Sequence, residues 1–332
     1  MALVGRQQTS RPTILLTDRI HPEAHARLAL DADIVVLPDG LSREDSDAAL
    51  LTMLPGAQGL IVRRQLPENV FDTPARLCGV VRHGVGLDFI PVARASARRI
   101  PVANTPAVNA NAVAEYVFAA MFAMSRQLAF FDHQVRQGNW RSRETAGAKT
   151  FDLRGRTLGV IGYGAIGRRI GDIANLGMSM NVVAHTSTPS RLPAYVRALS
   201  LEALFSASDF LVVACPLTPQ TRGMIDQRVL AFAKPGAVLI NVGRGPVICE
   251  GDLVSALNEG TISGAVLDVF EVQPLPMDSG LRSHPKVILT PHLAGMTQDA
   301  ERAMGLLAVD TMLSLVRGER PDNVVNQEIY SV

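Results

Sequence analysis

Short runs of β-branched and other apolar residues alternate with helix-length segments along most of the chain, and this alternation constrains the fold more than any other feature. The first series of runs is "TILLTD", "DIVVLP", "GLIVRR" and "LCGVVRHG", and the second is "TLGVIG", "MNVVAH", "FLVVAC", "AVLINVG", "GAVLDVF" and "KVILTPH". Strands that are separated by helices join through crossover connections and therefore run parallel. The sequence predicts an α/β protein with two doubly wound parallel sheets, one for each series.

Two longer segments set the expected domain boundaries. "NANAVAEYVFAAMFAMSRQLAFF" is typical of a single helix that Asn109 caps, with its Phe and Met stripe in the core. "TQDAERAMGLLAVDTMLSLVRGE" has helical periodicity and too few strands after it for a domain of its own, so we expect it to return to the first sheet. The predicted domains are residues 1–108 with 297–332, and residues 109–296. The length of 332 residues also favours two domains.

Charge and cysteine usage narrow the classes of partner. The formal net charge of +1 gives no basic surface for nucleic acid or an anionic membrane, and no run reaches the roughly 18 apolar residues of a membrane span. Cys78, Cys215 and Cys249 are embedded in apolar runs, which is typical of buried free thiols in a reducing compartment. "MALVGRQQTSRP" lacks the apolar core of a signal peptide and is expected to be a frayed leader. We therefore expect a cytoplasmic protein that binds small molecules and no metal.

A glycine pattern at the start of the second series indicates a nucleotide site. In "TLGVIGYGAIGRRI", Gly162, Gly164 and Gly167 follow an apolar strand and open a helix. Gly162 permits the tight turn, Gly164 lets a pyrophosphate approach the backbone, and Gly167 lets helix and strand pack closely. The strand before, the helix after and the further strand–helix units predict a Rossmann-like dinucleotide-binding domain.

The end of the next strand bears on the choice of dinucleotide. A carboxylate usually stands there and bonds the adenosine ribose of NAD, but His185 to Arg191, "HTSTPSR", contains none. Thr186, Ser187, Thr188 and Arg191 could instead bind a 2′-phosphate. Both NAD and NADP therefore stay open as cofactors, with NADP favoured.

The chain resembles the D-isomer-specific 2-hydroxyacid dehydrogenases over nearly its whole length. The matching stretches are "VVRHGVGLDFI", "NTPAVNANAVAEY", "LGVIGYGAIGRRI", "PLTPQTRGMI", "INVGRGPVICEGDLVSAL", "GAVLDVFEVQPLP" and "LTPHLAG". The resemblance implies two doubly wound domains, Rossmann-like or flavodoxin-like, with the first interrupted by the second and an active cleft between them. It also implies a homodimer formed through the nucleotide domain.

The resemblance assigns three catalytic positions. The substrate-binding arginine is Arg244 in "NVGRG", and the acid/base histidine is His292 in "TPHLAG". Glu271 and Gln273 fall on the same side of an extended segment, so alternation alone leaves both open as the partner of the histidine. The spacing of the family motif places the partner at Gln273, where a carboxylate is the commoner residue. Formate dehydrogenases, a branch of the same superfamily, have Gln there, but the short region before the first strand argues against that branch.

These residue types suit the reduction of a 2-keto acid. Hydride transfer leaves negative charge on the carbonyl oxygen, which His292 can protonate. Arg244 supplies a planar, permanently charged fork that binds the carboxylate and polarises the carbonyl. Gln273 can orient the ring of His292 through its amide oxygen, but it contributes no charge.

Further substrate contacts are expected from the first domain. The backbone amides of Val85 and Gly86, in the turn "HGVGLD", are expected to hold the substrate carboxylate. Arg63 matches a place where some members of the family bind a distal substrate charge, and Arg64 is its surface neighbour. His83 is expected to line the cleft without acting as a second acid.

The cofactor contacts come from several loops of the second domain. The predicted residues are Gly162, Gly164, Ala165, Ile166, Gly167, Thr186, Ser187, Pro216, Thr221, Val242 and Asp268. Asp268, at a strand end, is expected to bond the nicotinamide carboxamide or ring, with a helix-capping role as the alternative. Three loop residues depart from the commonest family pattern without affecting the reaction class: Ala107, Ala214 and Cys249.

The sequence thus predicts an NAD(P)-dependent oxidoreductase, a D-2-hydroxyacid dehydrogenase that acts on a small 2-keto acid such as glyoxylate or hydroxypyruvate. Two alternatives stay open. One is a phosphoglycerate dehydrogenase-type enzyme, and the other is a non-catalytic, corepressor-like protein that senses the dinucleotide. The intact Arg244 and His292 favour the enzyme.

Overall fold

The computed structural model describes residues 11–331, so the expected leader lies almost wholly outside the described residues. The chain divides into two compact units. Met1–Asn109 and Thr297–Val332 form unit 1, and Ala110–Met296 form unit 2. Unit 1 is therefore assembled from two segments that the whole of unit 2 separates in sequence.

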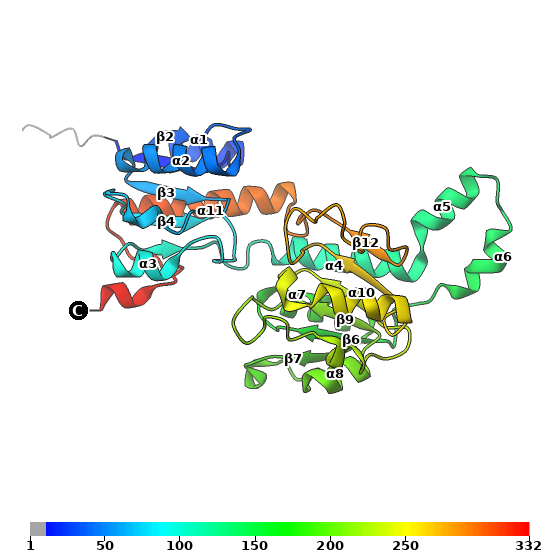
Figure 1. Ribbon diagram of the computed structural model, residues 1–332. Helices are drawn as coiled ribbons and strands as arrows, with labels where there is room; N and C mark the ends of the chain where they lie inside the picture. The colour runs from blue at the N-terminus through cyan, green and yellow to red at the C-terminus, as the bar shows by residue number, and fades with distance from the viewer. Residues whose placement is uncertain (1–10, 332) are drawn as a thin grey trace, which may run out of the picture. The chain divides into compact units, whose positions relative to one another are not determined.

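Unit 1 contains one five-stranded parallel sheet with the strand order β2-β1-β3-β4-β5 (Figure 1). Its strands are β1 (Thr13–Leu16), β2 (Asp33–Val36), β3 (Gly59–Val62), β4 (Gly79–Arg82) and β5 (Val102–Ala103). Its helices are α1 (Pro22–Ala29), α2 (Arg43–Met53), α3 (Val92–Ala97) and α11 (Gln298–Val316), with the short 3₁₀ turns η1 (Leu54–Gly56), η2 (Val70–Asp72) and η7 (Gln327–Tyr330). This order is that of flavodoxin-like sheets, so the predicted α/β class is confirmed here.

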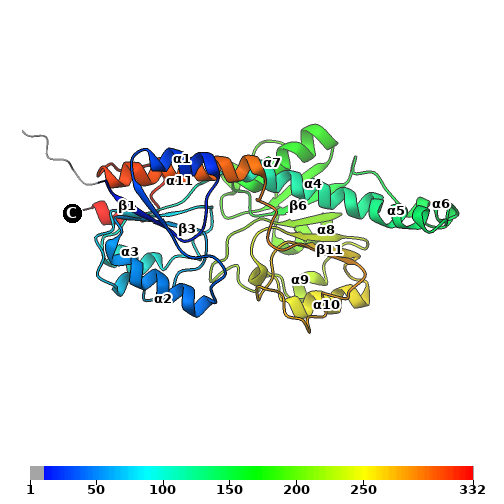
Figure 2. The same cartoon turned by 90° about the horizontal axis from the view of Figure 1, so that it is seen from above.

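Helices cover both faces of this sheet because successive strand residues point to opposite sides. In β3, Ile61 packs towards α1 and α11, whereas Leu60 packs towards α2 and α3. Figure 2 shows these two pairs of helices on opposite sides of the sheet. Helix α11 approaches the sheet so closely that a Cβ atom added at Gly59 would lie 2.3 Å from the sulfur of Met312. The helix that follows unit 2 in sequence is thus part of the core of unit 1.

Unit 2 contains one seven-stranded parallel sheet with the order β12-β11-β10-β9-β6-β7-β8. Its strands are β6 (Thr157–Ile161), β7 (Asn181–His185), β8 (Val196–Ala198), β9 (Phe210–Val213), β10 (Val238–Asn241), β11 (Gly264–Leu267) and β12 (Val287–Leu289). Its helices are α4 (Ala110–Arg126), α5 (Leu128–Arg136), α6 (Ser142–Ala146), α7 (Ala165–Asp172), α8 (Leu201–Ala207), α9 (Gln227–Leu230) and α10 (Glu250–Glu259). Short turns complete it: the 3₁₀ turns η3 (Gly147–Lys149), η5 (Pro189–Arg191) and η6 (Gly245–Val247), and the π turn η4 (Ile173–Gly177). Helices α4 and α7 cover one face, and α8, α9 and α10 cover the other.

The strand order of unit 2 reverses between β6 and β9, as in Rossmann-like sheets, which confirms the predicted class for the second unit as well. The short edge strand β8 was not expected, because three residues carry too little alternation to stand out in the sequence.

The single helix predicted over residues 109–131 is wrong. Helix α4 ends at Arg126, because Gln127 has a left-handed φ of 50°. The chain continues as a second helix, α5, which buries none of its residues and extends away from the sheet (Figures 1 and 2). Asn109 does not cap α4, since its side-chain oxygen is buried without a hydrogen-bond partner. Part of the apolar stripe is therefore surface: Phe118 is buried as predicted, but Phe130 is 43% exposed.

Candidate functional site

The turn from β6 into α7 has the geometry of a phosphate cradle. Gly162 has a φ of +93°, and a Cβ there would lie 2.6 Å from the backbone of Cys215. A Cβ at Gly167 would lie 2.2 Å from the carbonyl oxygen of Gly162, so helix and strand can pack only with glycine at both places. A Cβ at Gly164 would meet nothing within 4 Å, which leaves open space in front of the first amides of α7. Ala165 and Ile166 supply those amides, and a helix N-terminus favours anions.

The adjoining loop after β9 lies at the point where the strand order reverses, where doubly wound sheets bind ligands. Thr221 folds back onto this loop, because its hydroxyl donates to the carbonyl of Pro216 at 2.7 Å and accepts from the amide of Thr218 at 2.8 Å. The hydroxyl of Thr221 thus shapes the loop, while Pro216 is exposed at its edge.

The segment after β7 is polar and open. Thr186 is half-buried and accepts a hydrogen bond from the backbone amide of Thr188 at 3.3 Å, and Ser187 and Arg191 are exposed. Arg168, on α7, donates to the carbonyl of Arg191 at 3.1 Å. Two guanidinium-bearing residues therefore meet at this segment, and residues 185–198 include no carboxylate.

The loop after β10 holds Arg244 through an asparagine that sequence reasoning missed. Asn241, only 1% exposed, accepts from the amide of Gly243 at 3.0 Å and donates to the carbonyl of Arg244 at 3.1 Å. Arg244 itself is half-buried, with Nη1 donating to the carbonyl of Gly243 at 2.8 Å. Val242, predicted as a cofactor contact, is buried in the core of unit 2. An asparagine at a strand end in "INVGRG" is the signal that could have identified this support.

His292 lies just beyond β12 in a strained backbone conformation. Its φ is 56°, a left-handed value that costs a non-glycine residue roughly 1–3 kcal/mol. Its amide donates to the carbonyl of Asp268 at 2.9 Å, and its Nδ1 lies 3.1 Å from the amide oxygen of Gln273. An oxygen acceptor there places a proton on Nδ1, so Nε2 is the nitrogen suited to proton exchange.

Asp268 stabilises the backbone of the loop that carries His292. Its carboxylate is 1% exposed and accepts from the Thr290 hydroxyl at 2.6 Å, the amide of Leu293 at 2.8 Å and the amide of Ala294 at 2.9 Å. The hydroxyl of Tyr116, on α4, lies 2.6 Å from that of Thr290 and extends the network. None of these three donors lies in a helix, so the carboxylate holds a loop and the helix-capping alternative is not supported. The predicted contact of Asp268 with the cofactor stays a prediction.

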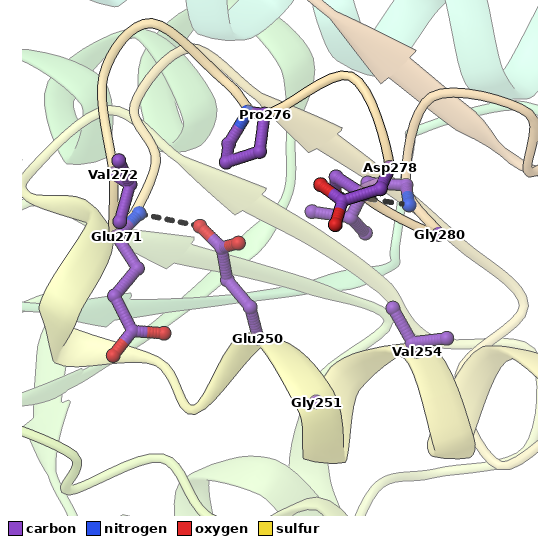
Figure 3. A pocket seen from close by; sticks show the side chains of 10 residues that line it. Glu250, Gly251, Val254, Glu271, Val272, Pro276, Asp278 and Gly280 are labelled. Carbon is purple, nitrogen blue, oxygen red and sulfur yellow. Dashed lines mark hydrogen bonds between the residues drawn. The ribbon is translucent and has the colours of Figure 1, made fainter.

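Glu271, the other candidate partner of the histidine, lines a cavity of about 310 Å³ beside α10 (Figure 3). Its backbone amide donates to the carboxylate of Glu250, which lies beside it in the lining of the same cavity. Burial raises the pKa of Glu250, the amide of Glu271 opposes this, and the charge of Glu271 raises it further. Gln273 therefore takes the place beside His292.

In unit 1, the turn after β4 is held by Arg82 and Thr105. Arg82 donates to the carbonyls of Val62 at 2.9 Å and of Gly86 at 3.2 Å. The fully buried Thr105 accepts the amide of Gly84 at 2.9 Å. Val85, at the tip, is 36% exposed. The turn that carries the two predicted carboxylate-binding amides is thus fixed by side chains that the motif did not reveal.

Arg63, Arg64 and His83 also stand at strand ends of unit 1. Arg63 forms an ion pair with Glu301 at 2.9 Å, and Arg64 forms one with Asp18 at 2.5 Å. His83 is 4% exposed, and its Nε2 has no hydrogen-bond partner in the described part of the chain. Burial, followed by the charge of Arg63, lowers the pKa of His83 to about 4, so its ring is neutral at pH 7.

Other ligand classes find little support within residues 11–331. No group of His, Cys, Asp and Glu side chains there is arranged to hold a metal, and no helix in that range is long and apolar enough to cross a membrane. Cys78, Cys215 and Cys249 are free thiols, and burial raises the pKa of each. Dinucleotide binding remains the function that the geometry of unit 2 fits.

Comparison with known proteins agrees with this geometry. Residues 118–294 match the family described as D-isomer specific 2-hydroxyacid dehydrogenase, NAD binding domain. The chain is 34% identical to glyoxylate/hydroxypyruvate reductase B of Yersinia pestis, over 96% of this chain and 98% of that protein. It is also 34% identical to glyoxylate reductase of Aeropyrum pernix, with 97% and 98% covered. Among solved structures, the NADPH-dependent glyoxylate/hydroxypyruvate reductase of Sinorhizobium meliloti, in complex with NADP and malonate, superposes with a TM-score of 0.80 at 33% identity and covers 95% of this chain and 97% of that one.

Proposed function

We propose, from the premise that this chain belongs to the D-isomer specific 2-hydroxyacid dehydrogenase family and is an NAD(P)-dependent oxidoreductase, that it reduces glyoxylate, hydroxypyruvate or a similar small 2-keto acid to the D-2-hydroxy acid. The observation that supports this most is the placement of His292, with one ring nitrogen bound to Gln273 and its loop held by Asp268. The relatives named for glyoxylate and hydroxypyruvate reduction suggest the substrate.

In the proposed reaction, each residue has a separate task. When bound, NAD(P)H supplies the hydride. Arg244 binds the substrate carboxylate and polarises the carbonyl, and His292 donates a proton from Nε2 to the carbonyl oxygen as negative charge develops there. Gln273 fixes the tautomer and orientation of the ring. Val85, Gly86 and Arg63 are proposed as further substrate contacts.

A panel of 2-keto acids tests this function directly. The chain should oxidise NADPH or NADH in the presence of glyoxylate or hydroxypyruvate, and the product should be the D-isomer where it is chiral. An Arg244→Lys variant keeps the charge but loses the planar fork, so its KM should rise. Absence of turnover with every acid and both cofactors would rule the proposal out.

We further propose that NADPH is the preferred cofactor. The segment after β7 carries no carboxylate to repel a 2′-phosphate, and Arg168 and Arg191 both lie at it. Arg191→Ala should weaken NADPH binding by roughly 1–2 kcal/mol, the contribution of a charge-assisted contact. Fluorescence titration of NADPH and NADH measures both affinities, with NADH as the internal control. A hundredfold preference of the unmodified protein for NADH would contradict the proposal.

A homodimer formed through unit 2 is the proposed assembly. The segment from α5 to α6 exposes a group of apolar side chains: Leu128, Phe130, Val135 and Trp140, which are 66%, 43%, 52% and 71% exposed. Exposed apolar side chains that gather on one segment, here around a helix α5 with no buried residue, are typical of a protein–protein contact surface.

Light scattering after size exclusion tests the dimer. Changing Phe130 and Trp140 to Ser should give a monomer, whereas Leu176→Ser, at an apolar residue that is 79% exposed on η4, should not. A monomeric unmodified protein would contradict the proposal.

Free thiols at Cys78, Cys215 and Cys249 support a cytoplasmic location, which fractionation of cells would check.

A further inference from the structure

The strand order in unit 1 reverses between β1 and β3, which is the place where a doubly wound sheet binds its ligands. Arg63 and Arg64 follow β3 at this point. The backbone amide of Arg63 donates to the hydroxyl of Thr17, which follows β1, at 2.9 Å. The two strand ends are thus tied together, with two guanidinium groups beside them.

Alternation sends these two arginines to opposite faces of the sheet. Arg63 continues the face of Ile61, which α11 covers, and its Nη2 lies 3.0 and 2.9 Å from the two carboxylate oxygens of Glu301 in the first turn of α11. Its Nη1 donates to the carbonyl of Arg19 at 2.8 Å. Arg64 points to the other face and binds both oxygens of Asp18, at 2.5 and 3.1 Å.

The Arg63–Glu301 pair is partly shielded from water. The side chains of Arg63 and Glu301 are 23% and 20% exposed, which is less than for Arg64 and Asp18 at 31% and 33%. His83, which follows β4 on the same face, is buried and neutral, so it adds no positive charge. Among Arg63, Glu301 and His83, Arg63 therefore carries the only positive charge, and the carboxylate of Glu301 neutralises it.

A second carboxylate, on the tail of a substrate, would bind unfavourably at this ion pair. A tail carboxylate approaching Arg63 has to displace Glu301 or lie beside it, and two carboxylates that share one guanidinium repel each other. Displacement also leaves Glu301 partly buried without a counter-charge, which is costly. An uncharged tail meets neither cost.

We propose that Glu301 determines substrate specificity: it occupies on Arg63 the position of a distal substrate carboxylate, so that the chain selects 2-keto acids with a single carboxylate. This inference rests on the proposed reduction of 2-keto acids and on Arg63 as a substrate contact. It assigns the selectivity to a residue 238 positions away from Arg63 in sequence, on a different element.

Substrate pairs that differ only by a tail carboxylate isolate the effect. Pyruvate with oxaloacetate, and 2-oxobutyrate with 2-oxoglutarate, are such pairs. The unmodified enzyme should favour the member without the tail carboxylate. Glu301→Gln keeps the shape but removes the charge, and should raise kcat/KM for the dicarboxylates relative to their partners by about tenfold. Adding Arg63→Ala to that variant should remove the gain.

Two further variants control for structure. Asp18→Asn neutralises the corresponding partner of Arg64 on the other face and should leave the selectivity unchanged. Glu301→Asp keeps the charge and should keep the selectivity of the unmodified enzyme. The proposal is overturned by an equal change for both members of each pair in Glu301→Gln, by the same gain in Asp18→Asn, or by an unmodified enzyme that already favours the dicarboxylates.

Binding separates this inference from the proposed function. If none of the acids is reduced with either cofactor, the proposed function fails. Calorimetric titration of D-lactate and D-malate onto the NADP-loaded protein then tests Glu301 alone. Glu301→Gln should strengthen binding of D-malate relative to D-lactate, and no relative gain overturns the role of Glu301.

Discussion

Two histidines of this protein each follow the carboxyl end of a parallel strand, and their surroundings differ in every respect. His83, directly after β4, is buried, its Nε2 has no partner among the described residues, and its pKa falls to about 4. His292, just beyond β12, is half-buried, is held in a left-handed conformation, and contacts Gln273 through Nδ1. The topology therefore brings both histidines to the carboxyl ends of parallel strands, but exposure to water and a hydrogen-bond partner for one ring nitrogen determine which of them can exchange a proton.

The largest expected effect is on catalysis, and it should separate the two histidines completely. His292→Asn removes the proton donor, so kcat should fall by about 10²- to 10⁴-fold, the usual contribution of a general acid. His83→Gln should leave kcat at pH 7.5 nearly unchanged, because the neutral ring of His83 donates no proton in the proposed reaction. Steady-state kinetics of both variants check this. A comparable loss in both would mean that the contrast between them is false.

The second prediction concerns stability against acid. Unfolded His83 binds a proton near pH 6.5, but the folded protein binds it only near pH 4, so the unfolded state takes up more protons within this window. Stability should therefore fall as the pH drops from 6.5 to 4, by about 3 kcal/mol over the whole window. His83→Gln should remove this part of the pH dependence. Urea unfolding at pH 7 and pH 5 measures it, and an unchanged pH dependence in the variant would exclude His83 as its cause.

The third prediction sharpens the role of Gln273. A carboxylate beside His292 favours the imidazolium, so Gln273→Glu should raise the kinetic pKa of the histidine by about one unit, or 1.4 kcal/mol. Because reduction needs protonated His292, the rate of the unmodified enzyme should fall off at lower pH than that of the variant, while oxidation stays active to lower pH. Profiles of kcat/KM against pH measure both. Glu271→Gln is the matched control, and a profile that moved only in this control would make Glu271 the partner.

The smallest expected effect concerns the hydrogen bonds that hold the loop of His292. Thr290→Val removes a hydroxyl that donates to Asp268 and contacts Tyr116, which should lower the free energy of unfolding by about 1 kcal/mol. Since the loop carries the proton donor, kcat should fall while the affinity for NADPH stays unchanged. Equal losses of kcat and cofactor affinity would indicate general damage to unit 2 instead.

Local patterns in the sequence predicted most of the fold. The β-branched runs became the strands of two parallel sheets, and the fold class and the family are confirmed, because alternation and the GxGxxG turn depend on neighbouring residues only. Local patterns were also the source of the errors. An apolar stripe that stays on the surface looks like a core stripe, so the break at Gln127 was invisible.

The supporting contacts of the candidate site were beyond prediction because they join distant segments. Nothing near Asp268 in sequence shows that its carboxylate binds amides at Leu293 and Ala294. The pairing of Arg63 with Glu301 depends on how α11 packs on the sheet, which no spacing rule gives. The resemblance did lead to Gln273 as the neighbour of His292, although its effect on the chemistry stays a prediction.

The return of α11 to unit 1 has a consequence for the order of events during synthesis. Residues 110–296 form a contiguous unit that can fold as soon as they leave the ribosome, whereas the sheet of unit 1 lacks one covering helix until residues 298–316 have been made. Until then, the face that bears Ile14, Ile61 and Val81 has no Met312 to cover it. Through the translation of nearly two hundred residues, α11 is missing from this face and α1 alone packs on it, so unit 1 is the part of the nascent chain that stays incomplete longest.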